Sequence, residues 1–285
     1  MSNYNGILLI DKPKGWTSTD VVRKVVRLTH AKVGQMGTLD PMATGVLPIA
    51  LGKATKLFDT FLTKQKRYIG SFDFGALYDT QDITGEIIDK SDFVPTCEAL
   101  QKSILKFVGE ISQIPPAYSA KKVNGCPAYK LARMKQEFNL KPKKINIYDI
   151  KLLEFDNRHF TLDITCSAGT YIRTLGVDIA KDAGAMVAMS ALQRIRSGDF
   201  RLEDCIQIED IDEQKIADNL ISIDDAISYI TALQVSQQEF YDLKDGKIIS
   251  KEITDGQYRI KFKNTLLGIA AASANKIKLE TYLYV

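Results

Sequence analysis

The chain has 285 residues, 45% of them hydrophobic, so it can bury a substantial core and is longer than one average domain. A formal net charge of +3 is too small to indicate a polyanion partner by itself. The four cysteines include no C-x-x-C pair and only two histidines are present, so neither a disulfide framework nor a zinc site is predicted.

The first predicted element is a short buried strand over residues 6–10, followed by a turn at Pro13 and Gly15. This apolar run is too short for a signal peptide or a membrane span, so we expect a cytoplasmic protein. Thr17 and Asp20 have the spacing of an N-terminal capping arrangement, which predicts a helix whose apolar face is formed by Val21, Val22, Val25, Val26 and Leu28.

Alternating apolar residues predict two strands, over 68–74 and 160–166. A helix is predicted between them, over residues 97–108. A second helix is predicted from about Thr170 to Ala183, directly after the strand that Gly169 closes. This order places Arg173 in the first turn of a helix.

Two further stretches differ from this pattern. Residues 115–144 are rich in Pro, Lys and Tyr and are predicted to form a long excursion from the main fold. Beyond residue 230 the pattern indicates short strands, with hairpin turns at Asp245-Gly246 and Asp255-Gly256. We therefore predict a large domain over residues 1–230 and a small β-rich domain over residues 231–285.

Charge is unevenly distributed along the chain. Residues 1–70 carry eleven basic and four acidic side chains, and residues 116–158 carry ten and four. The segments 71–115 and 159–230 are acidic, and residues 231–285 carry a slight positive excess. Such segregation is compatible with a partner of defined shape, such as folded RNA, and equally with chance clustering of solvated charge.

Three single residues are considered as candidates for a functional role. Asp40 lies in GTLDP, which by itself is typical of a turn, and Tyr68 by itself is typical of strand packing. Arg173 lies in an apolar run, so we expect it to be partly buried and to need a carboxylate partner. Phosphate-loop, G-x-G-x-x-G and G-x-S-x-G motifs are absent, which disfavours nucleotide-driven and serine-hydrolase chemistry.

Five motifs in the same order resemble the bacterial tRNA pseudouridine synthases that act on the T loop, the TruB family. They are LLIDKPKGWTSTDVV (8–22), GTLDPMATGVLPIALGKATK (37–56), KRY (66–68), IPPAYSAKKVNG (114–125) and CSAGTYIRTLGVDIA (166–180). The resemblance implies an α+β pseudouridine synthase fold, with a mixed, mostly antiparallel sheet flanked by helices and a small C-terminal PUA-like RNA-binding domain. The compact N-terminal region fits the stand-alone enzyme better than the related guide-RNA-dependent synthases.

The activity that the resemblance implies is isomerisation of uridine 55 in tRNA to pseudouridine, without a metal or other cofactor. Asp40 matches the family's nucleophile, and whether it attacks C1′, attacks C6 or assists a glycal-type elimination stays open. Arg173 matches the motif arginine, which we predict to form a salt bridge with Asp40 and to keep it ionised. Tyr68 matches the essential tyrosine, which would stack on the flipped base and is a candidate to take the C5 proton.

Further residues follow from the same resemblance. Tyr171 and Leu192 should line the uracil pocket, and Lys12 with Pro13 should support the catalytic loop. Residues 119–146 would form an RNA-gripping insertion with eight basic side chains: Lys121, Lys122, Lys130, Arg133, Lys135, Lys141, Lys143 and Lys144. The chain departs from the family at Gln35, where a histidine is usual and helps to rearrange loop nucleotides.

Two rival functions remain at this stage. A non-catalytic chaperone that unfolds and refolds the tRNA elbow would tolerate Asp40→Asn, whereas an enzyme would lose turnover and keep binding. The second rival is the same chemistry on a different RNA, which only substrate profiling can distinguish from the reaction on tRNA. We expect a monomer that binds the T stem-loop of tRNA, without guide RNA and without a membrane.

Overall fold

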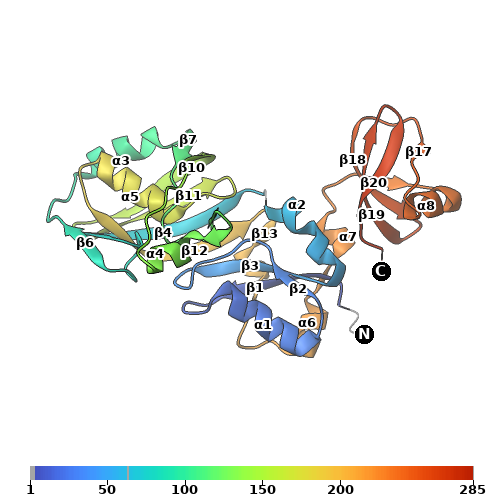
Figure 1. Ribbon diagram of the computed structural model, residues 1–285, viewed down its shortest axis with the longest axis horizontal. Helices are drawn as coiled ribbons and strands as arrows, with labels where there is room; N and C mark the ends of the chain where they lie inside the picture. Colours follow the sequence, from blue (N-terminus) through green and yellow to red (C-terminus); the bar gives the residue numbers. More distant parts are fainter. Residues whose placement is uncertain (1–3, 63, 285) are drawn as a thin grey trace.

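The computed structural model describes residues 4–62 and 64–284 and contains two large sheets (Figure 1). The larger sheet runs in the order β14-β1-β3-β12-β4-β11-β10-β7. Its strands are β1 (Gly6–Lys12), β3 (Thr44–Leu51), β4 (Lys66–Phe74), β7 (Gly109–Gln113), β10 (Lys143–Phe155), β11 (His159–Cys166), β12 (Val187–Ser197) and β14 (Ile206–Gln207), and the short strands β2 (Val33–Gln35), β13 (Phe200–Arg201) and β15 (Ile221–Ser222) pair at its side.

This sheet is mixed and mostly antiparallel, as predicted. Among the described strand pairs of this sheet, only β1–β14 and β3–β12 are parallel. The central strand β4 pairs with β11 on one side and with β12 on the other, and this register places Tyr68 between Ile164 and Arg194. The predicted strands over 6–10, 68–74 and 160–166 are therefore confirmed, each extended by one or two residues.

Helices flank the sheet in Figure 1. They are α1 (Ser18–Thr29), α2 (Phe58–Leu62), α3 (Cys97–Lys106), α5 (Ile172–Asp182), α6 (Glu213–Asp218) and α7 (Ile223–Ala226), with the 3-10 helices η1 (Gly52–Leu57) and η2 (Leu202–Asp204). The predicted cap of α1 is confirmed, because Thr17 accepts from the Asp20 amide while the Asp20 carboxylate accepts from the Thr17 amide. The predicted helices over 97–108 and 170–183 are confirmed with slightly shorter bounds.

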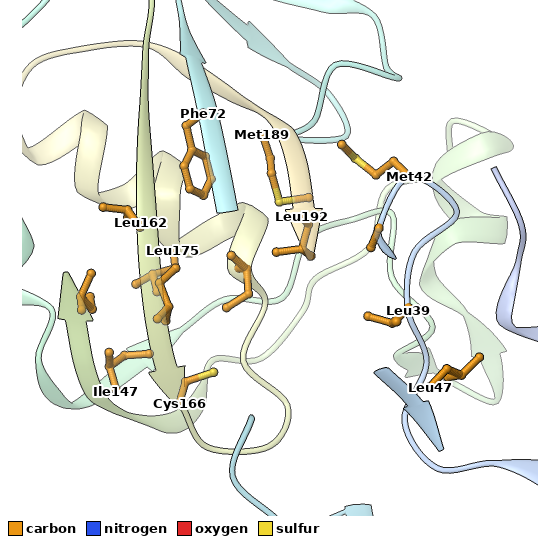
Figure 2. Close-up of a cluster of buried hydrophobic side chains, with 14 of the residues drawn as sticks. Leu39, Met42, Leu47, Phe72, Ile147, Leu162, Cys166, Leu175, Met189 and Leu192 are labelled. Atoms are coloured by element: carbon orange, nitrogen blue, oxygen red, sulfur yellow. The ribbon is translucent and has the colours of Figure 1, made fainter. Parts of the chain in front are cut away.

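Helix α5 packs directly on the central strand β4. A Cβ atom at Gly176 would lie 1.9 Å from the Phe72 ring, so only glycine allows the helix this close. Phe72 also stacks on Phe160 with ring centroids 5.1 Å apart. Figure 2 shows Phe72, Leu162 and Leu175 in one cluster of buried side chains, together with Leu39 and Met42 from the loop before β3.

The C-terminal part of the chain forms the second sheet, drawn in orange and red at the right of Figure 1. Its order is β16-β18-β19-β20-β17, with β16 (Ala232–Gln234), β17 (Ile249–Ser250), β18 (Gly256–Phe262), β19 (Thr265–Ser273) and β20 (Lys276–Tyr282), and helix α8 (Gln237–Lys244) packs on it. The β-rich character of this region is as predicted. The domain boundary near residue 230 stays a prediction.

Both predicted hairpin positions in this region are wrong. Asp245 and Gly246 end helix α8, where Gly246 has a φ of +81°, because a glycine after an acidic residue suits a helix end as well as a hairpin. Gly256 opens β18, and the strand before it, β17, pairs with β20 instead. The actual hairpin turns join β18 to β19 near Lys263 and β19 to β20 at Ala274-Asn275, all three with positive φ.

The stretch predicted as an excursion contains little regular structure. It holds the two-residue strands β8 (Lys122–Val123) and β9 (Cys126–Pro127) and the helix α4 (Ala128–Arg133). Its last residues, from Lys143 on, already belong to β10 and pair with β7. Strands β5 (Ala76–Tyr78) and β6 (Ile87–Lys90) form a separate ribbon after β4. Across residues 4–62 and 64–284, no helix is long and apolar enough to cross a membrane.

Candidate active site

A cleft of about 1330 Å³ crosses the larger sheet and collects most of the predicted site residues. Its floor is formed by β4 and β12 and by the first turn of α5. Its walls come from the loop before β3, from residues 79–86 and from residues 118–121, where the predicted insertion begins. Asp40, Tyr68, Arg173, Tyr171, Leu192 and Lys121 all line it.

The loop that carries Asp40 is fixed by hydrogen bonds to its main chain. The buried Ser18 hydroxyl donates to the Leu39 carbonyl (3.0 Å) and accepts from the Leu39 amide (2.9 Å). The Pro41 carbonyl accepts from the Gly15 amide (2.8 Å) and from Lys12 Nζ (3.3 Å). The motif around Asp40 is therefore a rigid element and not a free turn.

Apolar side chains fix the same loop from within. Leu39 and Met42, which flank Asp40 and Pro41, are 4% and 7% exposed and belong to the main core cluster. Burial of a side chain of this size contributes about 2 kcal/mol. The backbone at Asp40 therefore stays in place while its carboxylate faces the cleft.

Arg173 lies opposite Asp40 in the first turn of α5. Its Nε is 3.1 Å from Asp40 Oδ2, and its side chain is only 5% exposed, so the predicted ion pair is present. The other guanidinium nitrogens donate to the Thr80 carbonyl (2.7 Å) and the Tyr118 carbonyl (2.9 Å). These contacts fix the plane of the guanidinium group and leave Nε aimed at Asp40.

Arg173 has a second carboxylate partner, Asp82. Its Oδ2 lies 3.2 Å from Arg173 NH1, and the residue is buried. Thr80 Oγ1 and the Thr84 amide donate to its other oxygen at 2.9 and 3.0 Å. Because residues 81 and 83 are hydrogen-bonded to Met189 of β12, the main sheet positions this carboxylate.

These charges act on the pKa of Asp40 in opposite directions. Burial raises the pKa of Asp40 above its ordinary value, and the nearby charge of Asp82 raises it further. Arg173 and Lys12 oppose this shift because both favour the carboxylate form. The carboxylate side chain keeps 40% exposure toward the cleft, so a substrate can reach it.

Tyr68 is flanked by cationic side chains on the same face of the sheet. Arg194, its register partner on β12, is 1% exposed and donates to the carbonyls of Val46 (2.8 Å) and Gly37 (2.9 Å). Burial raises the pKa of Tyr68, and Arg194 opposes the rise. The phenol is therefore neutral at physiological pH.

Two buried lysines lie near this floor. Lys12 Nζ donates to the carbonyls of Pro13 and Trp16 at 2.9 and 2.7 Å as well as to Pro41, and Lys66 Nζ donates to carbonyls at the end of α2, including Leu62 at 2.7 Å. Burial, as the largest cause, lowers the pKa of each to about 8. Both are still protonated at neutral pH.

Comparison with known proteins identifies the family of this chain. Residues 23–172 match the TruB family pseudouridylate synthase N-terminal domain. A tRNA pseudouridine synthase B from Francisella philomiragia subsp. philomiragia is 41% identical over 283 residues, covering 96% of this chain and 93% of that protein. Another from Francisella tularensis subsp. novicida is 40% identical with the same coverage. The chain belongs to the TruB family. As a TruB-family pseudouridine synthase it is an isomerase.

Solved structures agree on the fold. The crystal structure titled as a Cbf5-Nop10-Gar1 complex superposes with a TM-score of 0.74 at 23% identity, covering 98% of this chain and 84% of that one. A structure titled as an archaeal box H/ACA sRNP Nop10-Cbf5 complex gives a TM-score of 0.70 at 22% identity, covering 98% and 86%. The predicted pseudouridine synthase fold is confirmed.

Of the remaining predicted residues of this TruB-family chain, some line the cleft and others lie behind it. Tyr171 precedes α5, and its main-chain amide and carbonyl are both bonded by the Gln113 side chain, at 2.8 and 3.0 Å. Leu192 is 8% exposed and faces the cleft from β12, beside Gly70 of β4. Lys12 lies behind the Asp40 loop and does not line the cleft.

Gln35 and Lys122 also lie outside the cleft lining. Gln35 ends β2, and its side-chain amide donates to the Thr38 hydroxyl at 2.9 Å, so it braces the start of the Asp40 loop. Lys121 and Lys122 are exposed, and only Lys121 reaches the cleft wall. These positions leave both lysines accessible to a large ligand.

Sequence reasoning missed Asp82, Lys66 and Arg194. Asp82 belongs to a polar segment that is typical of a surface turn, although its acidic residue between two threonines is a pattern that could hold a carboxylate in place. Alternation places Lys66 on the same face as Tyr68, but lysine and arginine side chains are seldom buried in a strand, so neither Lys66 nor Arg194 is predicted as a site residue. Both side chains are buried by other segments of the fold, the end of α2 over Lys66 and the Asp40 loop over Arg194.

Proposed function

We propose that this protein converts uridine 55 in the T loop of tRNA to pseudouridine. The observation that carries the proposal is the Asp40–Arg173 ion pair of 3.1 Å at the floor of a deep cleft, in a chain of the TruB family. The curated relatives that cover nearly the whole chain are tRNA pseudouridine synthases B, which supports tRNA as the substrate.

The target uridine would have to leave the loop of the tRNA to reach Asp40. A base stacked inside a folded loop does not expose its glycosidic carbon, so the enzyme must turn the nucleotide out of the stack. The cleft volume of about 1330 Å³ exceeds the range of about 300 to 1000 Å³ for small-molecule sites. Space of this size suits a turned-out nucleotide together with parts of its neighbours.

Asp40 would act as the nucleophile. The reaction breaks the bond from N1 to C1′, turns the uracil and rejoins it through C5, with neither a redox change nor net hydrolysis. A single carboxylate that is ionised and held in one orientation can start this sequence. Arg173 supplies both conditions, because it pairs with Asp40 and is itself fixed by two backbone carbonyls.

Tyr68 would hold the uracil during the rearrangement. Its ring lies on the face of β4 that lines the cleft, and stacking on a base offsets part of the cost of turning the nucleotide out. The hydroxyl is a candidate to take the proton from C5. Leu192 and Tyr171 would complete the dry pocket around the base.

The exposed lysines of the insertion would bind the phosphate backbone. Lys121 lies in the cleft wall and Lys122 follows it directly, and several further basic residues of the insertion are exposed. Contacts of this kind make binding depend on salt concentration. The C-terminal sheet would add a further RNA contact, as in a PUA-like domain.

The direct test is release of tritium from C5-labelled uridine in an unmodified tRNA transcript. We expect release by the wild-type protein from a transcript with uridine at position 55, and none when that position is cytidine. Release from both transcripts would mean that another uridine is the target. Tight tRNA binding without any release would contradict the enzyme and favour a tRNA chaperone.

A further inference from the structure

Buried positive charge exceeds buried negative charge at the cleft floor. The cleft is lined by three buried cationic side chains, those of Lys66, Arg173 and Arg194. Only Arg173 has carboxylate partners, namely Asp40 and Asp82. Within the part of the chain that the structure describes, no carboxylate oxygen lies within 4.0 Å of a side-chain nitrogen of Lys66 or Arg194.

Other acidic residues of the cleft do not balance this charge. Asp79 accepts from the Tyr118 hydroxyl and from the Glu86 amide, both at 2.8 Å, and Glu86 itself is exposed. Cys166 of β11 is the register partner of Lys66, and burial raises the pKa of its thiol to about 11, so it is neutral. Buried charges without a counter-charge are costly, and their retention at one place indicates a use.

Backbone carbonyls hold these two cations in position. Arg194 donates to Gly37 and Val46, and Lys66 donates to Phe61, Leu62 and Lys64. Carbonyl dipoles orient a cation without cancelling its charge. The positive potential therefore remains available inside a cleft from which a bound substrate would exclude water.

The sheet register places both cations beside Tyr68. Lys66 and Tyr68 are two residues apart on β4 and so share one face, and Arg194 is the direct partner of Tyr68 on β12. Neighbours of this kind have Cβ atoms about 5 to 7 Å apart. If Tyr68 stacks on the base, as the proposed function requires, the uracil lies next to two uncompensated positive charges.

Uracil becomes anionic in this reaction. When the bond from N1 to C1′ breaks, its electron pair stays on the base, and C1′ either receives the Asp40 carboxylate or the sugar loses a 2′ proton. C5 of the anion later attacks C1′, which releases the Asp40 carboxylate from C1′ or returns the proton to C2′, and the C5 proton then leaves to a base. We propose that Lys66 and Arg194 stabilise the uracil anion electrostatically during this step, a role that rests on the proposed function and goes beyond it.

The test uses Lys66→Gln, which removes the charge and keeps a donor, with Lys66→Arg as the variant that keeps the charge. Single-turnover consumption of the target nucleoside is measured at saturating tRNA, with uridine or 5-fluorouridine at the target position. Lys64→Gln is the matched control, because the Lys64 side chain lies outside the cleft lining and faces Tyr229 and Asp199, while the Lys64 carbonyl that accepts from Lys66 is kept.

For Lys66→Gln we expect the rate with uridine to fall about 10- to 100-fold, less than the loss typical of a direct oxyanion contact. The rate with 5-fluorouridine should fall less, because the fluorinated base is a better leaving group. The ratio of the 5-fluorouridine rate to the uridine rate should therefore rise. Lys66→Arg should recover most of the rate and the wild-type ratio. Lys64→Gln should match the wild type in both.

An unchanged ratio in Lys66→Gln would overturn the proposal, whether the rate falls, which indicates a purely structural role, or stays the same. Should Lys66→Gln lose its fold, as judged by melting temperature and tRNA binding, Arg194→Lys and Arg194→Gln provide the same comparison of charge kept and charge lost. Failure of the wild type to consume uridine would instead contradict the proposed function. The two failures are therefore distinguishable.

Discussion

The cleft floor and the insertion after it both carry cationic side chains, but they hold them in opposite ways. Arg173, Arg194 and Lys66 are at most 5% exposed and each is fixed by backbone carbonyls. Lys121 and Lys122 are exposed on a segment with little regular structure. A charge in a rigid, dry site acts on the reacting atoms, whereas an exposed charge is screened by salt and acts on binding. The comparison predicts that floor variants change the rate and insertion variants change the affinity.

Apart from Asp40, the largest loss of rate is expected at Arg173. Arg173→Gln removes the cation that orients Asp40, so the single-turnover rate should fall about 100- to 1000-fold while tRNA affinity stays within a few-fold. Arg67→Gln is the matched control, because Arg67 forms a bidentate pair with Asp163 on the neighbouring strand outside the cleft. A rate loss of similar size in both variants would show a general effect of breaking an ion pair.

A smaller loss is expected at Asp82. Asp82→Asn keeps an oxygen that can accept from Thr80 and Thr84, and removes the charge that faces Arg173. Arg173 is then less firmly held, so the single-turnover rate should fall about 10-fold with unchanged affinity. Asp163→Asn serves as control. A rate equal to that of the wild type would mean that the backbone contacts alone position Arg173.

The pH dependence of the single-turnover rate tests the role of the buried lysines without mutation. Lys12 and Lys66 have a folded-state pKa of about 8, lowered mainly by burial, against 10.5 for the unfolded chain. Lys12 faces Asp40, Asp11 and Arg194, and Lys66 faces Arg194 and the neutral Cys166. The rate should therefore fall as pH rises through 8, because the floor loses positive charge.

Stability should move in the other direction over the same range. Between about pH 8 and 10.5 the unfolded chain binds more protons at these two lysines than the folded chain, so their contribution to the free energy of unfolding increases with pH. Rate and melting temperature are measured from pH 7 to 9.5 on the wild type. A flat rate over this range would contradict a role for the buried ammonium groups.

The smallest effect on the chemistry is expected in the insertion. The double variant Lys121→Ala and Lys122→Ala should weaken tRNA binding several-fold near physiological salt and reduce the slope of log K against log salt by about one per lost phosphate contact. The single-turnover rate at saturating tRNA should not change. Lys90→Ala with Lys102→Ala, two exposed lysines outside the cleft, is the control. A reduced rate at saturating tRNA in the insertion variant would contradict the expectation that the insertion acts on affinity and the cleft floor on rate.

The sequence allowed prediction of those features that depend on local pattern. The cap of α1, the strand that carries Tyr68 and the helix that carries Arg173 follow from spacing within a few residues. The Asp40–Arg173 pair was predicted because both residues lie in motifs of one family. The Asp-Gly dipeptide at Asp245 was misread because the same two residues can end a helix or turn a hairpin.

Long-range features could not be predicted from the same patterns. Asp82 meets Arg173 across 91 positions of the chain, through a segment that is held by β12. Lys66 and Arg194 are charged residues in strands, and their burial follows from the way in which the end of α2 and the Asp40 loop close over the sheet. Tertiary contact, and not local propensity, decides where these charges lie.

Asp40→Asn tests the central claim most directly. The variant and the wild type are compared in single-turnover conversion, tRNA affinity and melting temperature. We expect conversion to be abolished and affinity to be retained. The melting temperature serves to show that the variant is folded, so that a loss of conversion reports on the carboxylate itself. Conversion at a rate comparable to the wild type would contradict the account, because the carboxylate would then not be the group that starts the reaction.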